Sequence, residues 1–142
     1  MIVLDTTVLV YATGGDHPLR EPCRRIVRGV ADGQLEATTT VEVLQEFTHV
    51  RARRRSREDA VELAGAYADL LGPLLPVTLD ELHAGLHIYR ASDRLGAFDA
   101  VLAAAALSVH AQALLSADGA FGQVPRLEHV FPDDAGVDAL LT

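Results

Sequence analysis

The chain has 142 residues, of which 49% are hydrophobic, and its formal net charge is −8. This length and apolar fraction suit one compact domain over residues 1–142, and the absence of a run of about 18 apolar residues excludes a membrane-spanning helix. All twelve basic residues are arginine, so the chain lacks the lysine that Schiff-base enzymes, Walker A loops and protein kinases require. The first residues have no basic flank of the kind that a signal peptide carries, which predicts a cytoplasmic protein.

The first half of the chain alternates short apolar runs with helical patterns. In chain order we expect a strand at 2–4, a helix at 19–31, a strand at 35–38 and helices at 41–54 and 57–71. The β-branched residues of the first run favour a buried strand. Either Thr39 or Thr40 can cap the helix at 41–54, and Glu42 would complete a capping box if Thr39 is the N-cap.

The second half continues this alternation. In chain order we expect a strand at 74–77, helices at 79–91 and 98–110, a strand at 113–116, an edge strand at 128–131 and a short terminal helix at 135–140. The helix at 98–110 is so rich in alanine that we expect it to be buried on most sides. Strands alternating with helices predict an α/β fold, a three-layer α/β/α sandwich with a short parallel sheet.

Four acidic residues are expected at the edge of the sheet where such folds bind ligands. Asp5 and Asp118 each follow an expected strand, and open α/β sheets bind ligands outside the carboxyl ends of their strands. Glu46 and Asp99 lie in early turns of helices that start near this edge. An acid on an apolar helix face is costly without a counter-charge, and the chain has no lysine to provide one. Mg²⁺ or Mn²⁺ would provide it, because hard divalent cations prefer oxygen ligands.

Four segments of the chain resemble the motifs of PIN-domain ribonucleases of the VapC toxin type. They are the segments VLDTT at 3–7, TVEVLQEF at 40–47, FDAVLAAA at 98–105 and LSADGAF at 115–121. The resemblance implies an α/β/α fold and endonucleolytic cleavage of RNA by water activated on Mg²⁺ or Mn²⁺. It also implies a homodimer, and a cognate antitoxin whose C-terminal tail enters the acidic groove.

The resemblance assigns roles to individual residues. The catalytic and metal-binding quartet of the family corresponds to Asp5, Glu46, Asp99 and Asp118. Thr7 and Ser116 correspond to hydroxyl positions that support the metal shell.

One assignment stays open. Glu42 and Glu46 lie one helical turn apart and share a face. The family spacing from Thr40 favours Glu46 as the principal acid, which leaves Glu42 as an accessory acid or a helix-cap residue.

Positive charge is concentrated beside Glu46. From Arg20 to Arg57 there are nine arginines against five acids, whereas from Glu58 onward there are three arginines against thirteen acids. Cations that neutralise phosphates supply most of the affinity for nucleic acids. We therefore expect part of this basic segment to contact RNA, namely Arg51, Arg53, Arg54 and Arg55. A merely solvated face is the alternative interpretation.

Two other functions are compatible with the sequence. A strand that ends in Asp5 is also typical of haloacid-dehalogenase-type phosphatases with an aspartate nucleophile, although Thr7 stands where that pattern has a second aspartate. The third hypothesis is a catalytically inactive domain that only binds RNA or a partner protein.

Overall fold

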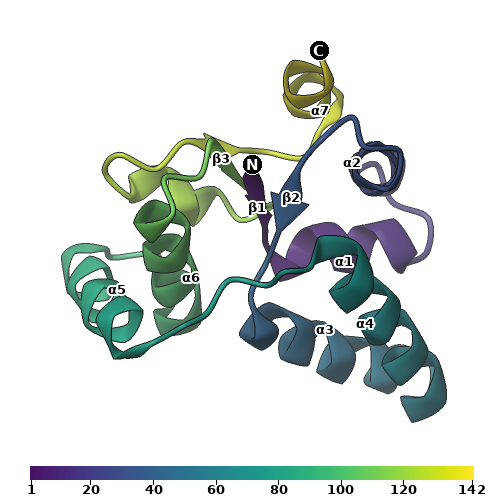
Figure 1. The fold of residues 1–142 in the computed structure, drawn as a ribbon, viewed down its shortest axis with the longest axis horizontal. Helices are drawn as coiled ribbons and strands as arrows, with labels where there is room; N and C mark the ends of the chain where they lie inside the picture. The colour runs from purple at the N-terminus through teal and green to yellow at the C-terminus, as the bar shows by residue number, and fades with distance from the viewer.

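A four-stranded parallel sheet lies at the centre of the computed structural model, which describes all residues from 1 to 142 (Figure 1). Its strands are β1 (Ile2–Leu4), β2 (Ala37–Thr38), β3 (Ala113–Leu115) and β4 (His129–Val130), in the order β2-β1-β3-β4. Every neighbouring pair is parallel, so the carboxyl ends of all strands meet at one edge. The expected edge strand at 128–131 is confirmed by β4.

Seven α-helices surround the sheet. They are α1 (Thr6–Thr13), α2 (Arg20–Ala31), α3 (Val41–Arg54), α4 (Arg57–Leu71), α5 (Leu79–Ala91), α6 (Ala97–Ser108) and α7 (Asp134–Leu141), and a short 3₁₀ helix, η1 (Gly119–Gln123), follows β3. Figure 1 shows α5 and α6 on one side of the sheet and α1 and α2 on the other, which confirms the α/β/α sandwich. None of these helices has the length and apolarity needed to cross a membrane.

The core consists of the strands and the helix faces that cover them. All residues of β1 and β3 are buried, as is typical of parallel strands covered on both faces. On α6, Ala100, Ala103 and Ala106 are completely buried. Their small side chains allow this helix to lie close to its neighbours, so the alanine-rich sequence is explained by packing.

Two elements differ from the expectation. Residues 74–77 do not form a strand of the sheet and make only an isolated bridge between Leu75 and Thr40. Pro73 and Pro76 flank this bridge, and proline has no N–H group to donate to a ladder. Conversely, α1 was not predicted, because its sequence TTVLVYAT is rich in β-branched residues that favour strands.

The start of α3 resolves the choice between two possible caps. Thr40 is the N-cap, and its side chain accepts a hydrogen bond from Val43 N at 3.2 Å. The capping box that Thr39 would form with Glu42 is therefore absent. Instead, the Thr39 hydroxyl donates to Leu4 O at 2.7 Å and ties the start of α3 to β1.

Candidate active site

Asp5 lies at the carboxyl end of β1, where the strand turns directly into α1. Ser116 Oγ donates a hydrogen bond to Asp5 Oδ2 at 2.6 Å, and Thr7 Oγ1 donates to the same oxygen at 3.1 Å. Asp5 is only 4% exposed, yet its Oδ1 accepts no hydrogen bond and remains accessible. One carboxylate oxygen is thus fixed by two hydroxyls, and the other is open to a ligand.

The loop after β3 is tied to the same two hydroxyls. Ala117 N donates to Thr7 Oγ1 at 3.0 Å, and Asp118 N donates to Ser116 Oγ at 3.0 Å. Asp118 Oδ1 in turn accepts from Ala120 N at 2.9 Å and caps η1. Asp118 is therefore placed beside Asp5, with one of its two oxygens already engaged in its own loop.

Asp99 joins this group from the first turn of α6. Burial and, in decreasing order of importance, the negative charges of Asp5, Asp118 and Glu46 together raise the pKa of Asp99 to about 7. Like charges shift a pKa in this way only when they lie close together. The structure therefore gathers all four predicted acids at the carboxyl edge of the sheet.

An open cleft of about 280 Å³ runs along three of these acids, Asp5, Glu46 and Asp99. Asp5, Glu42, Glu46 and Asp99 line it, and both glutamates are exposed on α3. Glu46 is close enough to contribute to the raised pKa of Asp99, whereas Glu42 is not among the causes. The geometry therefore favours Glu46 over Glu42 as the acid that works with Asp99.

Most of the other residues that line the cleft are apolar, which the sequence did not indicate. Val77, Leu82, Leu86, Phe98 and Val101 line it, and the Phe98 side chain is 81% exposed. Leu82 and Leu86 are spaced i,i+4 on α5, so their shared face was readable from the sequence. Their exposure was not, because it depends on how α5 packs against α6.

The donor set fits a hard cation, although it is not closed around a single point. No three His, Cys, Asp or Glu side chains converge tightly enough to ligate one ion together. The acids offer only oxygen donors, however, and none of the four forms an ion pair with an arginine. An open, uncompensated set of carboxylates suits Mg²⁺ or Mn²⁺ with part of its water shell retained.

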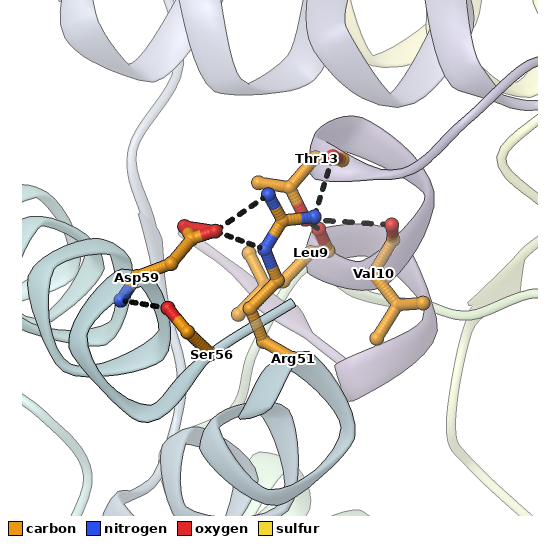
Figure 2. Close-up of polar contacts among 6 residues, drawn as sticks. All are labelled: Leu9, Val10, Thr13, Arg51, Ser56 and Asp59. Atoms are coloured by element: carbon orange, nitrogen blue, oxygen red, sulfur yellow. Dashed lines mark hydrogen bonds and ion pairs between the residues drawn. The ribbon is translucent and has the colours of Figure 1, made fainter. Parts of the chain in front are cut away.

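Arg51 does not have the free guanidinium that we expected of an RNA contact. Its Nε and Nη2 donate to Asp59 Oδ2 at 3.1 and 2.9 Å, and its Nη1 donates to Thr13 O at 3.0 Å (Figure 2). The Arg51 side chain is only 14% exposed. Figure 2 shows this guanidinium between α1, α3 and α4, where Ser56 Oγ also accepts from Asp59 N at 3.1 Å. The geometry gives Arg51 a structural role in joining three helices.

The other three arginines of the run differ from Arg51. Arg53, Arg54 and Arg55 are exposed, and none of them forms an ion pair. They lie at the end of α3, the helix that carries Glu46. Their guanidinium groups are therefore available to an external anion near the acidic cleft.

Comparisons with known proteins agree with this arrangement. The PIN domain family model matches residues 2–127. Ribonuclease VapC7 of Mycobacterium tuberculosis is 50% identical over 145 residues, which cover 99% of this chain and 98% of that protein. Ribonuclease VapC13 of the same organism is 24% identical over 130 residues, which cover 92% of this chain and 99% of that protein.

Solved structures show the same fold. VapC20 of M. tuberculosis, described as a sarcin-ricin loop cleaving toxin, matches with a TM-score of 0.72 and 20% identity, covering 86% of this chain and 93% of that one. VapBC2 from Rickettsia felis, crystallised with a DNA fragment from its promoter, matches with a TM-score of 0.70 and 16% identity, covering 92% and 98%. The PIN domain model matches most of the chain, and VapC7 is 50% identical over nearly the whole length of both proteins. The chain therefore belongs to the PIN-domain family and, within it, to the VapC type.

Proposed function

We propose that this protein is a metal-dependent endoribonuclease that serves as the toxin of a toxin–antitoxin pair. The observation that carries the proposal is the accessible Oδ1 of Asp5 beside three further carboxylates at one edge of the sheet. Family membership supports it, because relatives that this chain matches over nearly their whole length are named ribonucleases. RNA as the substrate also supports a cytoplasmic site of action.

In this proposal Asp5, Glu46, Asp99 and Asp118 would hold Mg²⁺ or Mn²⁺, and Glu42 would be an accessory acid at the cleft. When bound, such an ion activates water for attack on a phosphodiester and offsets the charge on the leaving oxygen. Burial and the neighbouring carboxylates raise the pKa of Asp99, so its charged form would be stabilised by a bound cation. The use of Mg²⁺ or Mn²⁺ as the ion is itself part of the proposal.

The protein's own residues have distinct tasks in this mechanism. Ser116 and Thr7 hold Asp5 Oδ2, so that Oδ1 keeps a fixed direction. The same hydroxyls accept hydrogen bonds from the backbone N–H groups of Asp118 and Ala117. These hydrogen bonds fix Asp5 and the loop after β3 relative to each other, and this limits the reorganisation needed when substrate binds.

RNA cleavage with matched variants tests the nuclease. The full chain is incubated with total RNA in Mg²⁺, in Mn²⁺ and in EDTA, and compared with Asp5→Asn, Asp99→Asn and Asp69→Asn. Asp69 is exposed on α4 and serves as the control. We expect Asp5→Asn and Asp99→Asn to lose about 100-fold or more in rate, because both remove a metal-facing charge. Equal cleavage by all four proteins would overturn the proposal.

Two further measurements, covalent labelling of Asp5 with phosphate and retention of RNA, separate the two alternatives. A phosphatase that uses Asp5 as nucleophile would accumulate phosphate covalently bound to Asp5, and the position of its second aspartate is occupied by Thr7, whose hydroxyl supports Asp5. An inactive binding domain would retain RNA without cutting it in either ion.

The proposed partners are a cognate antitoxin and a second copy of the chain. A small protein encoded next to this one, with a DNA-binding N-terminal region, is the expected antitoxin. Co-expression should yield a complex that does not cleave RNA, and light scattering of the free chain should give the mass of a dimer. A monomer at micromolar concentration would contradict the homodimer, and unimpeded cleavage by the complex would contradict the antitoxin.

A further inference from the structure

A second groove opens beside the acidic cleft, between α1 and α3. It has a volume of about 260 Å³, and its lining includes Thr7, Tyr11, Val50 and Arg54. Glu46 lines both this groove and the acidic cleft. The two depressions therefore lie on either side of a shared residue, Glu46, and the lining of the groove follows α3 from Glu46 to Arg54.

Arg54 is the only basic residue that lines this groove. Glu46, Val50 and Arg54 follow one another at intervals of four residues, so they lie along one face of α3. Eight residues of α-helix rise about 12 Å, which sets the distance along α3 between the acid and the guanidinium. Arg54 is exposed and has no ion pair, so its positive charge is free at the far end of the groove.

The neighbouring arginines are directed elsewhere. Arg53 lines a different pocket, between α3 and α4, together with His49 and Arg57. Arg51 is engaged by Asp59 and by α1. The run of arginines is therefore not one uniform basic face, and a single member of it shares a groove with the acids.

The α1 side of the groove provides an aromatic surface. Tyr11 lines the groove, and its ring stacks on that of His17 with centroids 4.3 Å apart and an interplanar angle of 26°. His17 Nδ1 accepts a hydrogen bond from Leu19 N at 3.1 Å, which helps to hold the ring pair in place. Single-stranded RNA is bound by such a combination of a phosphate-binding cation and an aromatic ring.

We propose that the α1–α3 groove binds the single-stranded RNA segment next to the cleaved phosphate, with Arg54 on a backbone phosphate and Tyr11 against a ribose or base. The inference rests on the proposed ribonuclease function and adds to it the path of the strand. It distinguishes Arg54 from Arg53 and Arg55, which the sequence could not do.

Binding of RNA in the absence of metal tests the role of Arg54. The full chain in EDTA is titrated into a fluorescein-labelled, random-sequence single-stranded oligoribonucleotide, and anisotropy is measured over a series of NaCl concentrations. We expect Arg54→Gln to weaken binding about three- to tenfold and to reduce the salt slope by about 0.7, the value for one phosphate contact to a single strand. Arg54→Lys should restore the slope because it restores the charge.

Arg53→Gln is the matched control, because it removes the same charge from the adjacent exposed position. We expect this control to change the affinity and the salt slope less than Arg54→Gln does, because Arg53 lies outside the groove. Equal effects of Arg53→Gln and Arg54→Gln would mean that only net charge matters, and would overturn the groove while leaving the nuclease intact. A wild-type chain that neither binds nor cleaves RNA would instead overturn the proposed function, and with it this inference.

Tyr11→Leu tests the aromatic surface separately. Loss of one stacking contact should weaken binding by about fivefold or more without changing the salt slope, because no phosphate contact is removed. Tyr89→Leu, which alters an exposed tyrosine on α5 outside both depressions, should bind as the wild type does. A Tyr11→Leu protein with wild-type affinity would contradict the aromatic part of the proposal.

Discussion

Ser116 Oγ and Asp5 Oδ2 are hydrogen-bonded at 2.6 Å although the two residues lie 111 positions apart in the chain. The register of the sheet explains this contact. Leu4 of β1 is paired with Leu115 of β3, so the next residue of each strand continues the same alignment past the end of the ladder. The position of the hydroxyl beside the acid is therefore a direct consequence of strand pairing.

Removal of the Ser116 hydroxyl should weaken both activity and stability. Ser116→Ala leaves Asp5 with Thr7 as its one supporting hydroxyl and leaves Asp118 N without its acceptor. We expect cleavage to fall about tenfold or more, as for other groups that orient a metal ligand, and stability to fall by about 1–3 kcal/mol. RNA cleavage and urea denaturation measure the two effects. Ser108→Ala is the control, because the Ser108 hydroxyl is hydrogen-bonded only to Ala105 O on α6, and it should retain wild-type cleavage. Equal cleavage by Ser116→Ala and Ser108→Ala would contradict the role of Ser116.

Asp99 should make the metal-free protein less stable as pH rises. The pKa of Asp99 is raised from 3.8 to about 7 in the folded protein. Between these values the folded protein holds a proton that the unfolded chain has released, so the free energy of unfolding decreases with rising pH and levels off above about 7. In EDTA the melting temperature of the wild type should therefore fall more between about pH 5 and about pH 8 than that of Asp99→Asn.

The control and the metal give two further comparisons for Asp99. Asp69→Asn should follow the wild-type pH profile, because Asp69 is exposed on α4. Mg²⁺ or Mn²⁺ at about pH 8 should raise the melting temperature of the wild type more than that of Asp99→Asn. If the wild type and Asp99→Asn have the same pH profile of melting temperature, the pKa of Asp99 is not raised in the folded protein.

Loss of the Arg51 guanidinium should destabilise the junction of α1, α3 and α4. Arg51→Gln leaves Asp59 and Thr13 O without their donor at a site where the Arg51 side chain is 14% exposed. We expect a loss of about 2 kcal/mol in urea denaturation. Arg55→Gln removes an exposed, unpaired charge and should change stability by less than about 0.5 kcal/mol. Additive effects of Arg51→Gln and Asp59→Asn in the double variant would contradict a direct ion pair.

Two helical glycines should respond to alanine in opposite directions. A Cβ added at Gly85 of α5 would lie 2.7 Å from the Cα and the Cγ2 of Val101 on α6, whereas a Cβ added at Gly65 of α4 meets nothing within 4 Å. We expect Gly85→Ala to cost about 1–3 kcal/mol through overpacking. Gly65→Ala should add about 0.5–1 kcal/mol of stability through helix propensity. Thermal denaturation measures both, and a stabilising Gly85→Ala would contradict the close approach of α5 to α6.

The sequence predicted most helices because their boundaries carry local signals. Ser56 caps α4 by accepting from Asp59 N, and Thr78 forms a capping box with Glu81 at the start of α5; both are short-range contacts that a pattern can reveal. The helix α1 was missed because its stability comes from contacts with α2 and α3, which override its β-branched composition. The strand expected at 74–77 does not form although the segment is apolar. Pro73 and Pro76 have no backbone N–H group to donate to a neighbouring strand.

The acidic site was predictable as a set of residues but not as a geometry. Parallel strand ends meet at one edge, so Asp5 and Asp118 were expected to be neighbours. The sequence could not show that Asp5 has one fixed and one accessible oxygen, since that depends on two hydroxyls from different segments. Nor could it distinguish Arg51 from Arg54, because their difference arises from the way α3 is oriented against α1.

The central place of β1 between β2 and β3 also has a consequence for protein synthesis. Asp5 is made well before its partner Ser116, which follows β3 and lies 111 residues later in the chain. A nascent or truncated chain that ends before β3 therefore has neither the second neighbour of β1 nor the hydroxyl that orients Asp5. The acidic site is therefore completed only after β3 and Ser116 have been translated, so products truncated before them should be unable to assemble it.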